Sequence, residues 1–559
     1  MNWIHQRLIT KEVKVGDLGI GGKNPIRVQS MTNVNTLNTD AVVKQTIELV
    51  NAECELVRIT APGIAEAENL KTIKKKLRSM GYPVPLIADI HFSAKAAEIA
   101  ARYVEKIRIN PGNYADKKQF KQLEYTDLEY NFELERISER IKPLIEICKQ
   151  EGTAMRIGVN HGSLSDRIIS RYGDTPMGMA MSALEYAEVC LSLGYDNLVF
   201  SMKSSDVKVM IYSTRLLVNL FHQKGMNFPI HIGVTEAGAG ADGRIRSAAG
   251  IGALLSEGIG DTIRVSLTEN PISEIPVAQQ IIHPFSLGVT KFVDTPLFVK
   301  PIYPNHNPFE YSLRTPHFFS ARAVIVSNNT LIRNEDLSPE AIHNFSKIEI
   351  NSDVEDTLKE GKATTPLILS SNSKIPIQQV KDYVRTHLFG STQPLIFKRD
   401  YSSYSAAHTS IYAAADMGAL AADGLINGIY IQNDSISGEE CYNLSLDILQ
   451  ACGLRCYKTE IISCPSCGRT NYDIEGLLQQ VKQRLSGFEG LKIAVMGCVV
   501  NGPGEMSDAD YGLVGAGEGK LWLYKGKVPI IKNIPQSEAA DRLLAYIKED
   551  YLKELSDKN

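Results

Sequence analysis

The sequence predicts an α/β protein with a (β/α)8 barrel of the TIM type, a central α/β insert and a C-terminal α/β unit. Eight short apolar runs alternate with stretches of helical periodicity between residues 26 and about 270. Strands that alternate with helices form parallel sheets. Eight such units within about 250 residues fit a closed barrel better than a doubly wound open sheet. After residue 285 the alternation weakens, and cysteines gather in the last quarter of the chain.

Each apolar run is short enough for a strand and ends in polar residues. The runs occupy residues 26–32, 55–60, 85–92, 105–113, 154–163, 197–205, 229–238 and 261–267. Helical periodicity separates them, for example in TDAVVKQTIELVNAE (39–53) and AMSALEYAEVCLSLG (180–194). Because the strand-to-helix loops of a barrel converge at the carboxyl end of the strands, we expect the active site there.

The later part of the chain divides less clearly. A plausible helix at 270–284 ends the barrel pattern, and loops such as KPIYPNHNPFE then interrupt the alternation. We therefore expect a substrate-binding barrel over residues 1–285, an α/β insert over 286–436 and a C-terminal unit over 437–559.

Composition excludes several classes of protein. The formal net charge of −4 over 559 residues gives no support for bulk nucleic-acid binding, so any anion site must be local. The sequence contains no run of 18 apolar residues, so we expect no membrane span. The first residues, MNWIHQRLIT, lack the apolar core of an export signal, and we expect a cytoplasmic protein.

The cysteines indicate a metal site rather than disulfides. Cys464 and Cys467 form a C-x-x-C pair, which suits zinc, an iron–sulfur cluster or redox dithiol chemistry. Cys498 supplies a third thiol in the turn GCVVNGPGE, and Glu505 ends the same turn. Structural zinc sites usually close with cysteine or histidine, and no histidine follows His408. Spacing alone leaves structural zinc open.

The identity of a fourth ligand also stays open from spacing. Cys452 and Cys456 are alternatives to Glu505, although their place at the end of an apolar helix favours plain packing. A shell of three thiolates and one oxygen would leave one iron of a cluster with an exchangeable ligand.

The predicted barrel supplies cations for an anionic ligand. Five basic residues lie in or at the ends of five different strands, and three residues of neutral polarity lie near them. The basic residues are Arg58, Arg108, Arg156, Lys203 and Arg264, and the neutral ones are Asn110, Asn160 and Ser266. Converging cations predict an anionic ligand such as a diphosphate.

Four further residues are candidates for acid–base chemistry or for orienting the ligand. Glu236, in VTEAG, is best placed to handle a proton. His91 and His161 serve either as direct catalysts or as orienting hydrogen-bond partners, and Asp89 can pair with a neighbouring arginine. The Gly-rich stretch 238–258 lacks the Lys-Ser/Thr of a P-loop, so nucleotide binding is not supported.

At this point the chain resembles a known family. VQSMT, IADIHF, RINPGN, RIGVNHGSL, SMKSSD, GVTEAG and IRVSL resemble, in this order, segments of the 4-hydroxy-3-methylbut-2-enyl diphosphate synthase family, as do CPSCGRT and GCVVNGPGE. The match covers roughly residues 1–285 and 437–535. The resemblance implies a TIM-type barrel and a C-terminal domain whose 4Fe-4S cluster is held by Cys464, Cys467, Cys498 and Glu505.

The resemblance also implies an activity. Family members open 2-C-methyl-D-erythritol 2,4-cyclodiphosphate reductively and dehydrate it to (E)-4-hydroxy-3-methylbut-2-enyl diphosphate in the methylerythritol phosphate pathway of isoprenoid synthesis. The two electrons would come from a flavodoxin or a ferredoxin, and Glu236 is the expected proton donor. The insert of this chain is placed as in three-domain members of the family, and we expect it to act as a structural spacer. In two-domain members the cluster domain caps the partner's barrel, so a homodimer stays an open prediction here.

Two rival interpretations remain at this point. The first is a non-redox barrel enzyme that acts on a phosphorylated substrate and carries a structural zinc in its C-terminal domain. The second is a nucleic-acid-binding module that uses CPSC as half of a zinc ribbon. The acidic balance and the missing second C-x-x-C pair count against the second.

Overall fold

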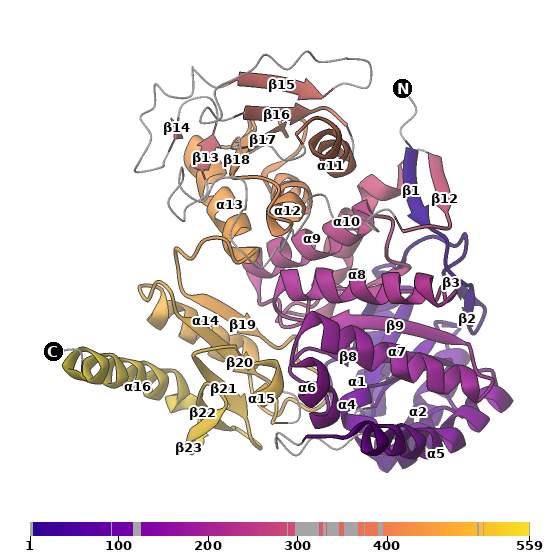
Figure 1. The fold of residues 1–559 in the computed structure, drawn as a ribbon. Coiled ribbons are helices and arrows are strands. Elements are labelled where there is room, and N and C mark those ends of the chain that lie inside the picture. Colours follow the sequence, from indigo (N-terminus) through magenta and orange to yellow (C-terminus); the bar gives the residue numbers. More distant parts are fainter. Residues whose placement is uncertain are drawn as a thin grey trace.

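The chain folds around the predicted barrel (Figure 1). The computed structural model describes residues 4–90, 92–115, 124–287, 289–296, 324–327, 331–332, 346–350, 367–373, 375–388, 395–499, 502–506 and 508–557. All eight predicted barrel strands are confirmed. They are β4 (Arg27–Met31), β5 (Leu56–Thr60), β6 (Leu86–Asp89), β7 (Lys106–Ile109), β8 (Ala154–Asn160), β9 (Leu198–Lys203), β10 (His231–Ile232) and β11 (Thr262–Ile263).

The eight strands close into a ring. Their order is β10-β11-β4-β5-β6-β7-β8-β9, and every neighbouring pair is parallel. A parallel bridge between Phe200 in β9 and Ile230, just before β10, joins the two ends of the sheet. All polar strand ends therefore point to one rim.

Helices follow the strands and cover the outside of the barrel. They are α1 (Thr39–Asn51), α2 (Ile64–Ser79), α3 (Ala94–Ala100), α4 (Pro111–Tyr114), α5 (Asp127–Glu151), α6 (Asp166–Tyr172), α7 (Pro176–Ser192), α8 (Val207–Gln223), α9 (Gly240–Ser256), the 3-10 turn η1 (Pro271–Ser273) and α10 (Glu274–Ser286). Side-chain oxygens cap the amino ends of most of these helices. For example, Asn38, Ser165 and Asp206 each accept a hydrogen bond from a backbone N–H of the first turn.

The amino end of the barrel is closed by a hairpin. Strands β2 (Val13–Val15) and β3 (Leu18–Ile20) pair antiparallel, and their buried side chains pack on residues near the beginnings of the barrel strands. These residues are Leu56, Ile87, Ala154 and Val199. Before the hairpin, β1 (Ile4–Leu8) pairs with β12 (Val289–Val293) beyond the barrel. Because the hairpin covers the amino end of the barrel, a ligand can enter only from the carboxyl end.

The insert is a separate α/β layer. The described strands of its sheet have the order β14-β13-β18-β17-β16-β15, and among them only β14 runs antiparallel to its neighbour. The strands are β13 (Val324–Ser327), β14 (Leu331–Ile332), β15 (Ser346–Ile350), β16 (Leu367–Ser371), β17 (Leu395–Asp400) and β18 (Gly428–Gln432). The helices are α11 (Pro376–His387), α12 (Ala406–Ala422) and α13 (Gly438–Ala451).

Helix α13 bears on the second domain boundary. It contacts β13 and β18 of the insert sheet. The next strand, β19 (Glu460–Ser463), belongs to the C-terminal sheet. The expected division at 436/437 stays a prediction, and we propose that the insert extends through α13.

The insert packs closely on the barrel through α9 and α12. An ideal Cβ at Gly252 in α9 would lie 2.7 Å from the Cβ of Ala415 in α12, and one at Gly418 would lie 2.7 Å from that of Ala249. Small residues therefore let the two helices approach closely. A buried ion network adds to this contact, because Arg215 bonds both Glu257 of the barrel and Asp423 of the insert.

The C-terminal unit is a five-stranded sheet in the order β19-β20-β21-β22-β23. Its further strands are β20 (Lys492–Met496), β21 (Tyr511–Gly515), β22 (Lys520–Lys525) and β23 (Val528–Pro535). Helices α14 (Ile474–Leu485) and α16 (Gln536–Asp557) share one core with the sheet, and the short α15 (Gly502–Glu505) lies on the side facing the barrel (Figure 1).

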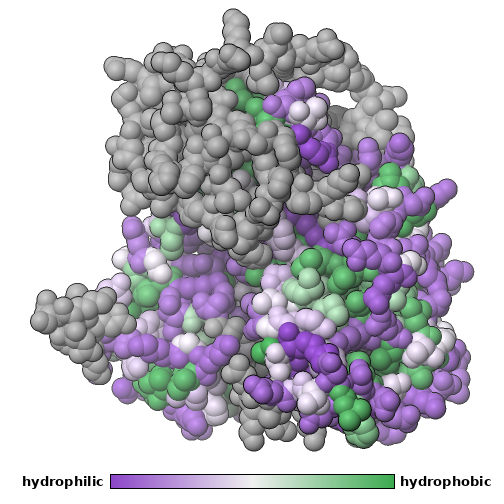
Figure 2. All heavy atoms as spheres, in the orientation of Figure 1, coloured by the Kyte–Doolittle hydropathy of each residue, from purple (hydrophilic) through white to green (hydrophobic). Residues whose placement is uncertain are grey.

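The visible surface mixes apolar and hydrophilic side chains. Figure 2 shows the apolar ones in patches that hydrophilic residues interrupt. Among the helices that the structure describes, none is both long and apolar enough to cross a membrane.

The close α9–α12 contact predicts a stability effect. Gly252→Val should lower the free energy of unfolding by about 1–3 kcal/mol, because the added side chain must displace Ala415. Chemical denaturation followed by circular dichroism measures this. The matched control is Gly487→Val, since a Cβ at Gly487 meets nothing within 4 Å. An equal effect of the two substitutions would contradict the packing argument.

Candidate functional site

A cavity that is partly open to solvent lies between the carboxyl end of the barrel and the C-terminal unit of the same chain. The barrel contributes Met31, Arg58, Asp89, Arg108, Arg156, Asn160, Lys203, Thr235, Glu236, Arg264 and Ser266. The C-terminal unit contributes Cys464, Pro465, Ser466, Cys467, Arg469, Thr470, Met496, Gly497, Cys498, Gly502 and Glu505. One chain therefore brings the two predicted groups of residues together.

Three cations of the cavity lie close to one another, with Arg156 and Lys203 buried and Arg58 half-buried. Burial lowers the pKa of Arg58 to about 10, with Asp89 opposing the shift and two other arginines adding to it. Burial also lowers the pKa of Arg156 and Lys203 well below their usual values, and neighbouring cations lower both further. Within the described residues, Nε and Nη1 of Arg156 and Nζ of Lys203 have no hydrogen-bond partner. Buried donors of this kind indicate a site for an anion.

Two other arginines are held by fixed partners. Nη1 of Arg108 lies 3.2 Å from Oδ1 of Asp89, and Nη2 donates to Oδ1 of Asn160 at 3.0 Å. Arg264 forms a two-bond pair with Glu274, at 3.0 and 2.9 Å. These carboxylates orient the guanidinium groups and neutralise part of their charge.

Glycine makes room for the cations. A Cβ at Gly158 would lie 2.4 Å from Nε of Arg108, and one at Gly233 would lie 2.5 Å from Nζ of Lys203. A side chain at Gly158 would therefore push the Arg108 side chain aside, and one at Gly233 would also meet the carbonyl oxygen of Arg264 at 2.2 Å.

Two carboxylates meet in the cavity, one from each unit. Glu236 follows β10 with a φ of 48°, a left-handed conformation that few non-glycine residues adopt. Burial and the adjacent Glu505 raise the pKa of Glu236 well above its usual value. Glu505 also accepts a hydrogen bond of 2.6 Å from Nδ2 of Asn160. Burial and the adjacent carboxylate both favour the protonated form of the Glu236 carboxyl.

Three thiols complete the cavity on the side of the C-terminal unit. Cys464 and Cys467 lie in the loop after β19, and Cys498 lies in the loop after β20. None of the three forms a disulfide within the described residues. A Cβ at Gly497 would lie 3.4 Å from Sγ of Cys464, so the backbone comes close to the thiol. Within the described residues, no group of three or more His, Cys, Asp or Glu side chains is placed to bind a single metal ion.

Most of the predicted site residues line this cavity, and two of those that the structure describes do not. Asn110 caps α4, where its side chain accepts the backbone N–H of Gly112 at 3.3 Å. His161 lies outside the cavity lining, with Nε2 3.5 Å from Oδ1 of Asp174. His91 lies outside the described residues.

The sequence reasoning missed a cation beside the thiols. Arg469 lies in the quoted motif CPSCGRT, two residues after Cys467, and lines the cavity. Burial lowers its pKa, but Cys467, Cys498 and Asp89 together hold it above its usual value. Its place in the motif was the available signal. Its partner Asp89, 4.0 Å away, comes from the barrel and could not be read from spacing.

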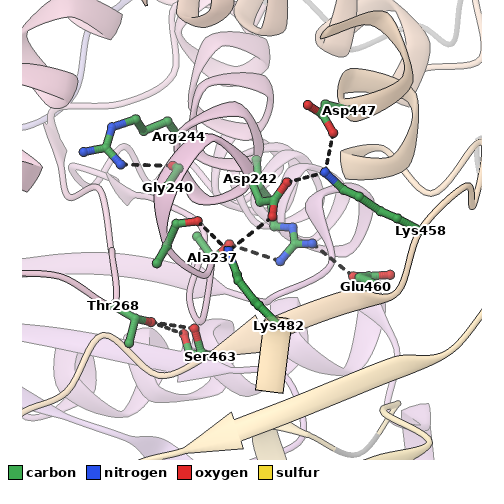
Figure 3. Close-up of polar contacts among 12 residues, drawn as sticks. Ala237, Gly240, Asp242, Arg244, Thr268, Asp447, Lys458, Glu460, Ser463 and Lys482 are labelled. Atoms are coloured by element: carbon green, nitrogen blue, oxygen red, sulfur yellow. Dashed lines mark hydrogen bonds and ion pairs between the residues drawn. The ribbon is translucent and has the colours of Figure 1, made fainter. Parts of the chain in front are cut away.

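The C-terminal unit is fastened to the barrel beside α9 (Figure 3). Ser463 forms a parallel bridge with Ala237, and its hydroxyl lies 2.6 Å from that of Thr268. Lys458 donates to Asp242 of α9 at 2.8 Å and to Asp447 of α13 at 2.5 Å (Figure 3). Helices α9 and α13 are thereby joined just before β19, the strand that leads into the first two thiols.

Family models match both halves of the cavity. The "GcpE TIM-barrel domain" model matches residues 10–279, and the "GcpE protein C-terminal domain" model matches residues 460–549. Curated relatives match almost the whole chain. A protein of Bacteroides thetaiotaomicron named "4-hydroxy-3-methylbut-2-en-1-yl diphosphate synthase (flavodoxin)" is 43% identical and covers 97% of both chains.

The chain belongs to the 4-hydroxy-3-methylbut-2-enyl diphosphate synthase family. Relatives with the same name occur in Akkermansia muciniphila, at 43% identity over 98% of this chain and 97% of that protein, and in Leptospira interrogans, at 41% over 98% and 97%. These alignments include the insert, which the two family models leave unmatched. The resemblance to three-domain members is thereby confirmed.

Closure of the cavity depends on a glycine at the barrel rim. Gly162 follows β8 with a φ of 74°, and a Cβ there would lie 2.0 Å from the carbonyl oxygen of Gly504. Gly504 adjoins Glu505, so this contact seats the Glu505 loop against the barrel.

Gly162→Ala should therefore leave the cysteine sites intact but hold the two halves of the cavity apart. We expect turnover to fall about 100-fold or more, since a displacement of 1 Å in an active site has effects of that size. Turnover and bound iron are measured on the same anaerobic preparation. Gly152→Ala is the control, because Gly152 has a φ of 68° but nothing within 4 Å of its Cβ position. Equal losses in both variants would show that backbone strain, not the rim contact, is responsible.

Proposed function

We propose that this protein is an iron–sulfur oxidoreductase that converts 2-C-methyl-D-erythritol 2,4-cyclodiphosphate to (E)-4-hydroxy-3-methylbut-2-enyl diphosphate. The observation that carries the proposal is the single cavity in which buried cations face three thiols and a carboxylate. Membership of the family supports the same activity. The rival non-redox enzyme would need the cations but would not need thiols in the same cavity.

The barrel cations would bind the diphosphate. Arg156 and Lys203 have buried donors without partners among the described residues, and Arg58 lies beside them. A bound diphosphate would supply the missing acceptors and offset the cost of burying like charges together. Arg108 and Arg264, already oriented by carboxylates, would add further bonds, with Asp89, Asn160 and Ser266 on the same wall.

The thiols would hold a 4Fe-4S cluster. The donor set of Cys464, Cys467, Cys498 and Glu505 fits it, because thiolates suit iron–sulfur clusters and a carboxylate is a weaker, exchangeable fourth ligand. When bound, the cluster supplies electrons and a Lewis-acidic iron, chemistry that side chains alone lack. Arg469 lies between the thiols and Asp89 and would neutralise part of the negative charge of the ligands.

Glu236 would supply the proton. The dehydration releases a hydroxyl group as water, and this step needs an acid near the ligand. Glu236 lines the cavity, and burial raises its pKa, which favours the protonated form. The roles of Asn110, His91 and His161 in the site stay predictions. The assignment of Glu236 as the proton donor does not depend on them.

The electrons would come from a separate protein. The relatives named above carry flavodoxin in their names, and we propose a flavodoxin as the donor here, with a ferredoxin as the alternative. A diffusible donor is expected in the cytoplasm. Because one chain lines both walls of the cavity, the proposed activity needs no homodimer.

The proton role of Glu236 predicts a large loss of activity. Glu236→Gln should lower kcat by about 10²–10⁴-fold, the usual contribution of a general acid, while bound iron and sulfide stay unchanged. Steady-state turnover with a chemical reductant measures the effect. Glu269→Gln is the control, since Glu269 pairs with Arg244 outside the cavity. Full activity of the Glu236→Gln variant would refute the proposal that Glu236 is the proton donor.

The cofactor is tested by metal analysis of anaerobically purified protein. We expect about four iron and four sulfide per chain, lost in Cys498→Ser and kept in Cys456→Ser, because Cys456 is exposed and lies outside the cavity. One zinc and no sulfide would refute the reductive mechanism. The anion-binding barrel would then belong to the rival non-redox enzyme.

A further inference from the structure

We propose that the β22–β23 hairpin is the docking surface for an acidic one-electron donor protein, and that electrons reach the thiol cavity through the side of the sheet that carries Trp522. This inference rests on the proposed reductive function and names the surface that such a function requires. Three observations carry it: the charge of the hairpin, its exposed apolar edge, and a packed connection from Trp522 to the cavity.

The hairpin has a one-sided charge. Residues 519–535 contain four lysines and no acidic residue, in a chain whose formal net charge is −4. The lysines are Lys520, Lys525, Lys527 and Lys532. One of them, Lys525, is paired with Asp550 of α16. Positive charge gathered on one exposed hairpin attracts an acidic partner and speeds the encounter.

The hairpin also exposes apolar side chains at the edge of the sheet. Val528 is 60% exposed and Ile530 is 39% exposed, both on the edge strand β23. An apolar patch bordered by hydrophilic residues lies over β22 and β23 at the lower left of Figure 2. Apolar contact inside a rim of lysines is the composition of a transient protein interface.

Trp522 links this surface to the interior. It is partly exposed, and Nζ of Lys532 lies 4.9 Å from the centroid of its indole ring. The indole stacks on Tyr524 and donates a hydrogen bond of 3.3 Å to Oδ1 of Asn533. The ring is therefore held in one orientation, with one side towards the lysine.

The interior side of Trp522 leads to the thiols. Trp522 pairs with Val514, and Val514 pairs with Met496, which lines the cavity two residues before Cys498. Paired residues on neighbouring strands face the same side of a sheet. Two interstrand steps span roughly 10 Å. The buried cluster that contains Met496 and Val514 also packs against Cys464. A path of packed side chains thus runs from the hairpin to the cavity wall.

The test compares two electron sources on the intact holoenzyme. One assay uses a flavodoxin kept reduced by NADPH and its reductase, and the other uses dithionite-reduced methyl viologen, a small reductant that needs no docking surface. For Lys520→Glu/Lys532→Glu we expect the KM for flavodoxin to rise about tenfold or more and to lose most of its salt dependence. Viologen-driven turnover and bound iron should stay within about twofold of the unaltered protein.

The control is Lys44→Glu/Lys75→Glu, which makes the same charge change on exposed lysines of α1 and α2. An unchanged KM in the hairpin variant would overturn the proposal. So would an equal rise in the control, or an equal loss in both assays, because the lysines would then act through net charge or through the fold. Failure of the proposed function has a different signature: the unaltered protein would not turn over even with viologen.

Discussion

The structure depends on a group of like charges held together inside the barrel. Arg58, Arg156 and Lys203 repel one another, and burial makes each positive charge more costly. This arrangement does not stabilise the fold, since a core of apolar residues in the same place would be more stable. The closed ring of strands and the hairpin at its amino end hold the cations in place until an anion neutralises them. The cations are thereby already oriented for the ligand, so binding requires little rearrangement of the protein.

Much of the fold and of the site could be predicted because both follow local rules. Strand and helix periods revealed the eight barrel units, and cations at strand ends must share one rim, so Arg58, Arg108 and Arg264 could be grouped without coordinates. The C-x-x-C pair identified Cys464 and Cys467 in the same way. Each of these signals lies within a few residues of sequence.

What could not be predicted depends on packing between distant segments. The contact of Glu236 with Glu505 joins residues from two units, and no pattern encodes it. His161 has the same kind of position in sequence as Asn160, yet its side chain lies beside Asp174 and outside the cavity lining. Asn110 directly follows β7, at the expected rim, but its side-chain oxygen caps α4 by accepting the backbone N–H of Gly112. Local chemistry at each strand end decides which polar side chains face the ligand.

The capping of the barrel by its own chain has a genetic consequence. In an enzyme whose halves come from different subunits, a copy damaged in the barrel and a copy damaged at the thiols can restore one working site by pairing. Here both walls of the cavity belong to one chain. Two such alleles expressed together should therefore fail to complement each other. Closure is also intramolecular, so specific activity should survive dilution, because the effective concentration of the cap is set by the insert and not by the amount of protein.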